Sequence, residues 1–88
     1  MEMPDRDDIR GWMLETLRGD LALGDEVDEA LAANPDEYML ELDSKTAEFL
    51  LVKIEILTGI NLPAPADLGP EQYASLGSLI DVALKGVQ

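Results

Sequence analysis

Residues 43–63 read DSKTAEFLLVKIEILTGINLP and contain the most clearly bounded helix of the chain. Asp43 and Ser44 are both residue types that favour a helix start, and Gly59 suits the left-handed conformation that ends one. We therefore expect a helix from Asp43-Ser44 to Thr58. At about 100° per residue, its core face should consist of Ala47, Leu50, Leu51, Ile54, Leu57 and Thr58.

A second apolar stripe lies on the opposite side of the same expected helix. It consists of Phe49, Val52 and Ile56, with the aliphatic stem of Lys45 beside them. The stripe is either a docking surface for a partner protein or part of the interior, because a helix that is apolar nearly all round is usually buried. A contact between two copies of the chain is a third alternative, although we expect a monomer.

Helical spacing also occurs on both sides of this segment. From Asp7 to Arg18, apolar residues recur every three or four positions, which predicts an amphipathic helix that stops at Gly19. A last helix is expected from Ser75 or Ser78 to Lys85, after a brief helical turn at Pro70 to Tyr73. No alternation with the period of a strand is present.

Two segments read as connections. The stretch from Asp20 to Leu42 is the least regular, and we expect a long connection with at most a short helical turn between Val27 and Ala32. The three prolines and one glycine between Asn61 and Pro70 predict an extended loop, with Ile60 and Leu62 pointing inward. The expected fold over residues 1–88 is an all-α single domain, a small bundle of three main helices and one short helix with a long first loop.

The charge balance narrows the range of partners. Nineteen acidic residues against six basic ones give a formal net charge of −13. Such a charge repels the phosphates of nucleic acids and anionic membrane surfaces, so we expect neither of them as a partner. The expected partners are basic protein surfaces.

The residue types that are absent from the sequence limit the kinds of catalytic and metal site that the chain can form. The chain has no cysteine and no histidine, which removes disulfides, thiolate metal sites and the Ser-His or Cys-His nucleophile pairs. We therefore expect a protein that is not an enzyme, with no catalytic residue and no metal site. Because no apolar run is long enough to span a bilayer and the first residues lack a secretory signal, we expect a cytoplasmic protein.

Ser44 is the candidate site residue. At a helix start, its hydroxyl lies near exposed amide groups and the positive end of the helix dipole, both of which favour an attached phosphate. Asp43-Ser44 is followed by Gly59-Ile60-Asn61-Leu62-Pro63, and 19 positions separate the serine from Pro63. In this pattern the sequence resembles the phosphopantetheine-dependent acyl carrier proteins. The resemblance runs from Leu40 to Pro63 and more loosely to Leu84.

The resemblance implies an acyl-carrier-like four-helix bundle with a covalent 4'-phosphopantetheine arm on Ser44. A phosphopantetheinyl transferase would attach this arm from coenzyme A. The arm would carry an acyl or aminoacyl group as a thioester among the loading and processing enzymes of fatty acid, polyketide or peptide-type biosynthesis. The helix after the serine would be the recognition helix. The expected partner contacts are Asp43, Lys45, Phe49, Val52 and Ile56.

Three positions depart from the family's pattern. Lys45 and Glu48 stand where apolar residues are usual, and Glu41 stands where a small residue is common. Because Glu48 would place a charge near the mouth of any cleft that holds the acyl chain, we expect a short or polar cargo, such as an amino acid or a polyketide unit.

An alternative function needs no prosthetic group. In it, the chain is a helical adaptor that binds a partner protein through Phe49, Val52 and Ile56. Ser44 could then be only a helix cap, worth about 1 kcal/mol.

Overall fold

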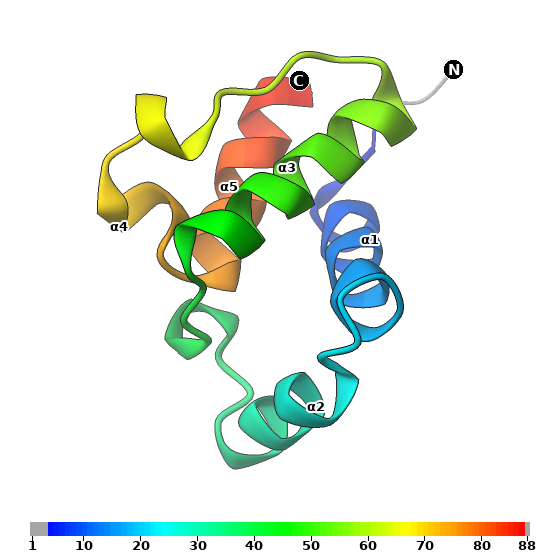
Figure 1. The fold of residues 1–88 in the computed structure, drawn as a ribbon, viewed down its shortest axis with the longest axis vertical. Coiled ribbons are helices and arrows are strands. Elements are labelled where there is room, and N and C mark those ends of the chain that lie inside the picture. Colours follow the sequence, from blue (N-terminus) through cyan, green and yellow to red (C-terminus); the bar gives the residue numbers. More distant parts are fainter. Residues whose placement is uncertain (1–3, 88) are drawn as a thin grey trace.

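The computed structural model describes residues 4–87, and within them the chain is built from helices (Figure 1). Four of the helices in this range have ten residues or more. They are α1 (Arg6–Arg18), α2 (Gly24–Ala33), α3 (Ser44–Thr58) and α5 (Leu76–Val87). The shorter elements are α4 (Pro70–Tyr73) and two 3-10 turns, η1 (Glu37–Met39) and η2 (Pro65–Asp67). Residues 4–87 contain no strand, so the prediction of a small all-α bundle is confirmed.

The core lies where α1, α3 and α5 meet. Each of these helices packs on the other two, and in Figure 1 α3 crosses the bundle in front of α5 with α1 beside it. Full burial of a large apolar side chain stabilises the fold by about 1.5–3 kcal/mol. The large side chains that are fully buried all come from these three helices: Ile9, Met13, Leu17, Leu50, Leu51, Ile54, Leu76, Leu79, Ile80 and Val87.

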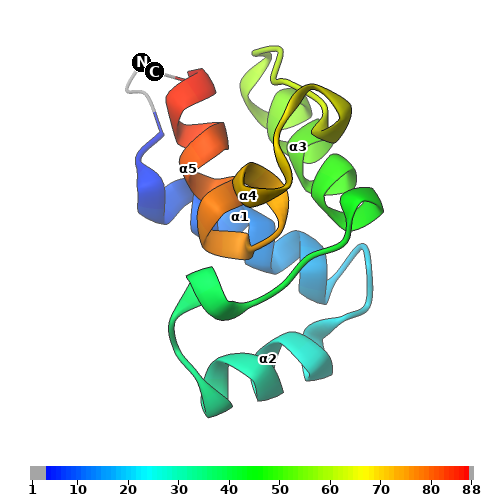
Figure 2. The same cartoon turned by 90° about the vertical axis from the view of Figure 1, so that its left-hand side faces the viewer.

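Helix α2 is the main departure from the sequence-based expectation. The prediction of a long connection with only a short turn is wrong, because Gly24–Ala33 forms nearly three turns of helix, and the bundle has one main helix more than expected. Its alanine, glutamate and leucine residues favour helix, and Asp25 and Glu26 lie at its positive end. Val27 is its one buried residue, so the apolar pattern was too short to reveal its length. Its helix partner is α1, and Figure 2 shows it set apart from the other helices.

The bounds of α3 agree with the prediction. The helix begins at Ser44 and ends at Thr58, and Gly59 has a left-handed φ of 73°. The predicted short turn is present as α4. Helix α5 continues to Val87, beyond the predicted end at Lys85, because the side chain of Val87 is buried in the core.

Two backbone hydrogen bonds fix the chain just before α3. The amide of Leu42 donates to the carbonyl of Ala74 over 2.7 Å, and the amide of Leu76 donates to the carbonyl of Leu40 over 2.9 Å. They flank an isolated antiparallel bridge between Glu41 and Ser75. The start of α3 is thereby held against the start of α5.

Candidate functional site

The cap of α3 is Asp43, and Ser44 is the first residue inside the helix. Asp43 has an extended backbone, and its carboxylate accepts a hydrogen bond of 2.7 Å from the amide of Thr46. This hydrogen bond holds the pKa of the Asp43 carboxyl below its usual value, so the carboxylate that caps the helix is the charged form.

Ser44 is therefore not needed as the cap. Its side chain is exposed, and the side-chain hydrogen bond that caps α3 comes from Asp43 and not from the Ser44 hydroxyl. The alternative in which Ser44 serves only as a helix cap is wrong, because its neighbour Asp43 already supplies the capping oxygen. The hydroxyl stands on an exposed corner where other molecules can reach it.

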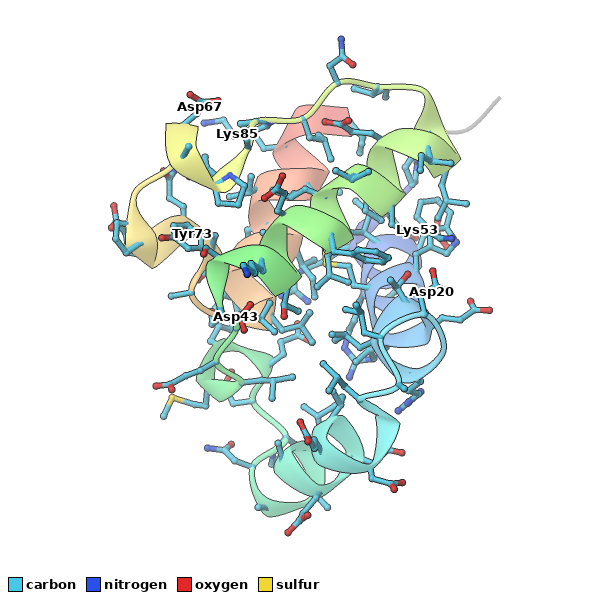
Figure 3. The ribbon with its side chains drawn as sticks, in the orientation of Figure 1. Asp20, Asp43, Lys53, Asp67, Tyr73 and Lys85 are labelled. Carbon is cyan, nitrogen blue, oxygen red and sulfur yellow. The ribbon has the colours of Figure 1, made fainter. Side chains whose placement is uncertain are left out.

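Ser44 lines an open cleft of about 330 Å³. Helix α3 supplies Ser44 and Glu48, the η2 segment supplies three small apolar residues, and α4 supplies Tyr73. The labelled side chains in Figure 3 show Tyr73 and Asp43 on the same, left-hand side of the molecule. The full lining is Ser44, Glu48, Ala64, Pro65, Ala66 and Tyr73. Glu48, which we expected at the mouth of a cleft beside Ser44, lines this one.

The contribution of α4 and η2 to this cleft was missed from the sequence. Tyr73 and Ala64 follow Ser44 by 29 and 20 positions, and no motif connects them to it. The signal that was available is the proline-rich loop, because Pro63, Pro65 and Pro70 turn the chain after α3. Packing of η2 on α3 then brings this loop to the serine.

The apolar stripe on α3 is exposed. Phe49 and Val52 are 42% and 44% exposed, and Ile56 is 72% exposed. The alternative that the stripe is packed inside the chain is therefore wrong for the described structure. Lys45, one turn before Phe49, is also exposed. The five expected contact residues, Asp43, Lys45, Phe49, Val52 and Ile56, thus all reach the surface, and their role in partner binding stays a prediction.

A second groove, of about 340 Å³, lies between α1 and α3. Trp12 and Leu57 line it, and Lys53 forms an ion pair of 3.1 Å with Asp20 at its edge (Figure 3). The prediction that Leu57 belongs to the core face is wrong, because this residue lies at the edge of the buried arc and is 49% exposed. The stripe therefore separates two hollows, one beside Ser44 and one beside Trp12.

Most of the basic residues are committed to ion pairs. Arg6 and Arg10 both pair with Glu37, Arg18 pairs with Asp28, and Lys53 pairs with Asp20. Within residues 4–87, Lys45 and Lys85 are the basic residues that form no ion pair. The ammonium group of Lys45, which follows Ser44 in the sequence, is therefore available to bind an anionic group of another molecule.

Two kinds of site are not found in the described part of the chain. No group of three or more histidine, cysteine, aspartate or glutamate side chains is gathered there in a way that could hold a metal ion. None of the helices in residues 4–87 has both the length and the apolar character needed to cross a membrane.

Comparisons with known proteins do not place the chain in a family. No family of proteins, no curated protein and no solved structure matches it. The resemblance to the acyl carrier proteins therefore rests on the sequence pattern itself, from Leu40 to Pro63 and more loosely to Leu84.

Proposed function

We propose that this chain is a carrier protein that holds an acyl or aminoacyl group as a thioester on a 4'-phosphopantetheine arm attached to Ser44. The observation that carries the proposal is the exposed Ser44 side chain at the first position of α3. Asp43 caps the helix in its place, and Ser44 lines a cleft. The spacing from Asp43-Ser44 to Pro63 supports the same assignment.

The surroundings of Ser44 suit a phosphate. The first turn of a helix offers amide groups that the helix leaves without partners, and its dipole is positive there. Lys45 adds an exposed cation that has no ion-pair partner within residues 4–87. When bound, the arm supplies the thiol that this cysteine-free chain lacks.

In this proposal the chain is a monomeric cytoplasmic carrier and not an enzyme. A phosphopantetheinyl transferase attaches the arm, and separate enzymes load and process the cargo in fatty acid, polyketide or peptide-type biosynthesis. The chain needs no nucleic acid and no membrane, in keeping with its net charge of −13. Its contribution is to present the arm and to be recognised.

The exposed stripe is the proposed docking surface for these enzymes. Phe49 lies little more than one helical turn after Ser44, and Val52 and Ile56 follow it along α3. A partner that covers the stripe is therefore placed next to the attachment point. We expect Phe49→Asp to abolish cargo loading without changing the helical circular dichroism signal, because Phe49 lies outside the core. Loading at the normal rate would exclude the stripe as the docking surface.

The deciding experiment is modification of the purified chain with coenzyme A and a broad-specificity phosphopantetheinyl transferase. Intact mass is compared for the native chain, Ser44→Ala and the control Ser78→Ala. We expect the native chain and the control to gain one phosphopantetheine unit and Ser44→Ala to gain none. If the native chain gains nothing with several transferases, the carrier proposal is wrong.

A helical adaptor without a prosthetic group is the second candidate, and the exposed stripe favours it as well. The two functions differ in what they require of Ser44. For an adaptor, Ser44→Ala leaves partner binding unchanged while Phe49→Asp abolishes it. For a carrier, both substitutions stop cargo transfer.

A further inference from the structure

The lining of the cleft beside Ser44 carries a net negative charge. Its lining contains one charged side chain, Glu48, together with the phenol of Tyr73 and three small apolar residues. Glu48 is exposed and forms no ion pair within residues 4–87. Lys45, the nearest basic residue along α3, is not part of the lining. The cleft therefore has one free carboxylate and the side chain of Tyr73 in its lining, and the lining supplies no cation.

Glu48 is within easy reach of a group attached to Ser44. The two residues are four positions apart on α3, so they lie on the same face with about 5–6 Å between their Cβ atoms. Both are carried by a regular helix whose start is fixed by Asp43. A flexible chain on the Ser44 oxygen can therefore bend back and place its end beside the carboxylate.

The charge of the cleft discriminates between classes of cargo. A cargo that ends in a carboxylate is repelled by Glu48 and by the acidic surface as a whole. A long alkyl chain laid in the cleft would take water away from Glu48 without providing a partner, which is unfavourable. An ammonium group instead forms charge-assisted hydrogen bonds with the carboxylate and can also donate to the oxygen of Tyr73.

We propose that the cargo carried on Ser44 ends in a positively charged amine, and that Glu48 and Tyr73 hold this amine in the cleft. The inference rests on the proposed function, because the cargo reaches the cleft through the arm on Ser44. It narrows the cargo to the aminoacyl class, with the amine left free. Glu48, which departs from the pattern of the acyl carrier family, is then the residue that selects the cargo.

The charge preference of the cleft can be tested without any transferase. Ser44→Cys introduces the single cysteine of the chain, which is labelled through a disulfide with aminoethyl, propyl or sulfonatoethyl groups of similar length. We expect nuclear Overhauser contacts from the label to Tyr73 and Ala66 for the aminoethyl group alone. They should weaken about two- to fivefold in Glu48→Gln, as for the loss of an exposed ion pair. The control Glu29→Gln, an equal charge change on α2, should keep them.

The same comparison is then made with thioesters on the arm. The transferase loads the native chain from β-alanyl, butyryl or succinyl coenzyme A, which differ in the charge of a terminal group of similar size. Intact mass reports attachment, and the contacts to Tyr73 and Ala66 report the position of the cargo. We expect the β-alanyl group alone to occupy the cleft, and less so at high salt.

The outcomes separate the two proposals. If no arm attaches to Ser44, the carrier function is wrong, and the disulfide labels still decide whether the cleft prefers cations. If the arm attaches and all three cargoes give the same contacts, the aminoacyl inference is wrong and the carrier function stands. Contacts that persist unchanged in Glu48→Gln would also overturn the inference.

Discussion

Ile54 and Ile56 carry the same side chain on the same helix, two positions apart, but Ile54 is 0% exposed and Ile56 is 72% exposed. Replacing a buried isoleucine by alanine costs about 2–5 kcal/mol, because contacts are lost and a cavity remains. Full burial of isoleucine contributes about 1.5–3 kcal/mol, and Ile56 has only the 28% that is not exposed to lose. We therefore expect Ile54→Ala to cost about 2–5 kcal/mol and Ile56→Ala to cost less than about 1 kcal/mol.

Urea unfolding followed by circular dichroism measures both costs, and it should be repeated at two protein concentrations. Independence from concentration is expected for a monomer. Equal losses for the two variants would refute the reasoning, because they would mean that the stripe is buried. If the loss for Ile56→Ala depended on concentration, the buried surface would be a contact between two copies of the chain.

The same pair of variants tests the docking surface. Ile56→Ala should slow cargo loading by a partner enzyme about fivefold or more, as expected when a contact worth over 1 kcal/mol is truncated. Ile54→Ala, assayed where it is still folded, should load at nearly the native rate. If Ile54→Ala slowed cargo loading more than Ile56→Ala, the stripe would not be the surface that determines loading.

The remaining predictions concern the backbone, the cap and the attachment residue. Gly59→Ala should lower the free energy of unfolding by about 1–2 kcal/mol, because Gly59 has a left-handed φ. Gly11→Ala should raise it by about 0.5–1 kcal/mol, because the new Cβ meets nothing within 4 Å. Thermal unfolding of the two variants and the native chain measures both changes. Asp43 has a lowered pKa, so its capping contribution is present above the ordinary value of 3.8 and lost as the pH falls through the folded pKa. Acid unfolding of Asp43→Asn should accordingly show a weaker pH dependence than that of the native chain. Ser44→Ala should change the free energy of unfolding in urea by less than about 0.5 kcal/mol, because Asp43 keeps the cap; a larger loss would contradict that assignment.

The helix that carries the candidate site could be predicted from the sequence because its limits depend on local interactions. The carboxylate of Asp43 meets the amide of Thr46 three residues later, and Gly59 ends the helix through its own backbone conformation. The resemblance to a carrier family also depends on this segment. Local chemistry of this kind is visible in a single sequence.

The cleft, α2 and the outer edge of α3 could not be predicted in the same way, because they depend on packing between distant segments. Tyr73 reaches the cleft because α4 packs on α5 and η2 packs on α3. Leu57 has the right spacing for the core, but the packing of α1 against α3 leaves it half exposed in a groove. Helix α2 depends on α1 and buries Val27 alone, which leaves too little apolar pattern to mark its length.

The way in which α2 is attached has a consequence for the cooperativity of the molecule. Because α2 rests on α1 and buries one of its side chains, its opening exposes little apolar surface and should cost a small part of the global free energy of unfolding. The three helices around the core would then form one cooperative unit that keeps Ser44 in place. Helix α2 would be a second unit, which exchanges its amide hydrogens and is cleaved by proteases before the three core helices. Its opening would leave the start of α3, where Ser44 lies, undisturbed.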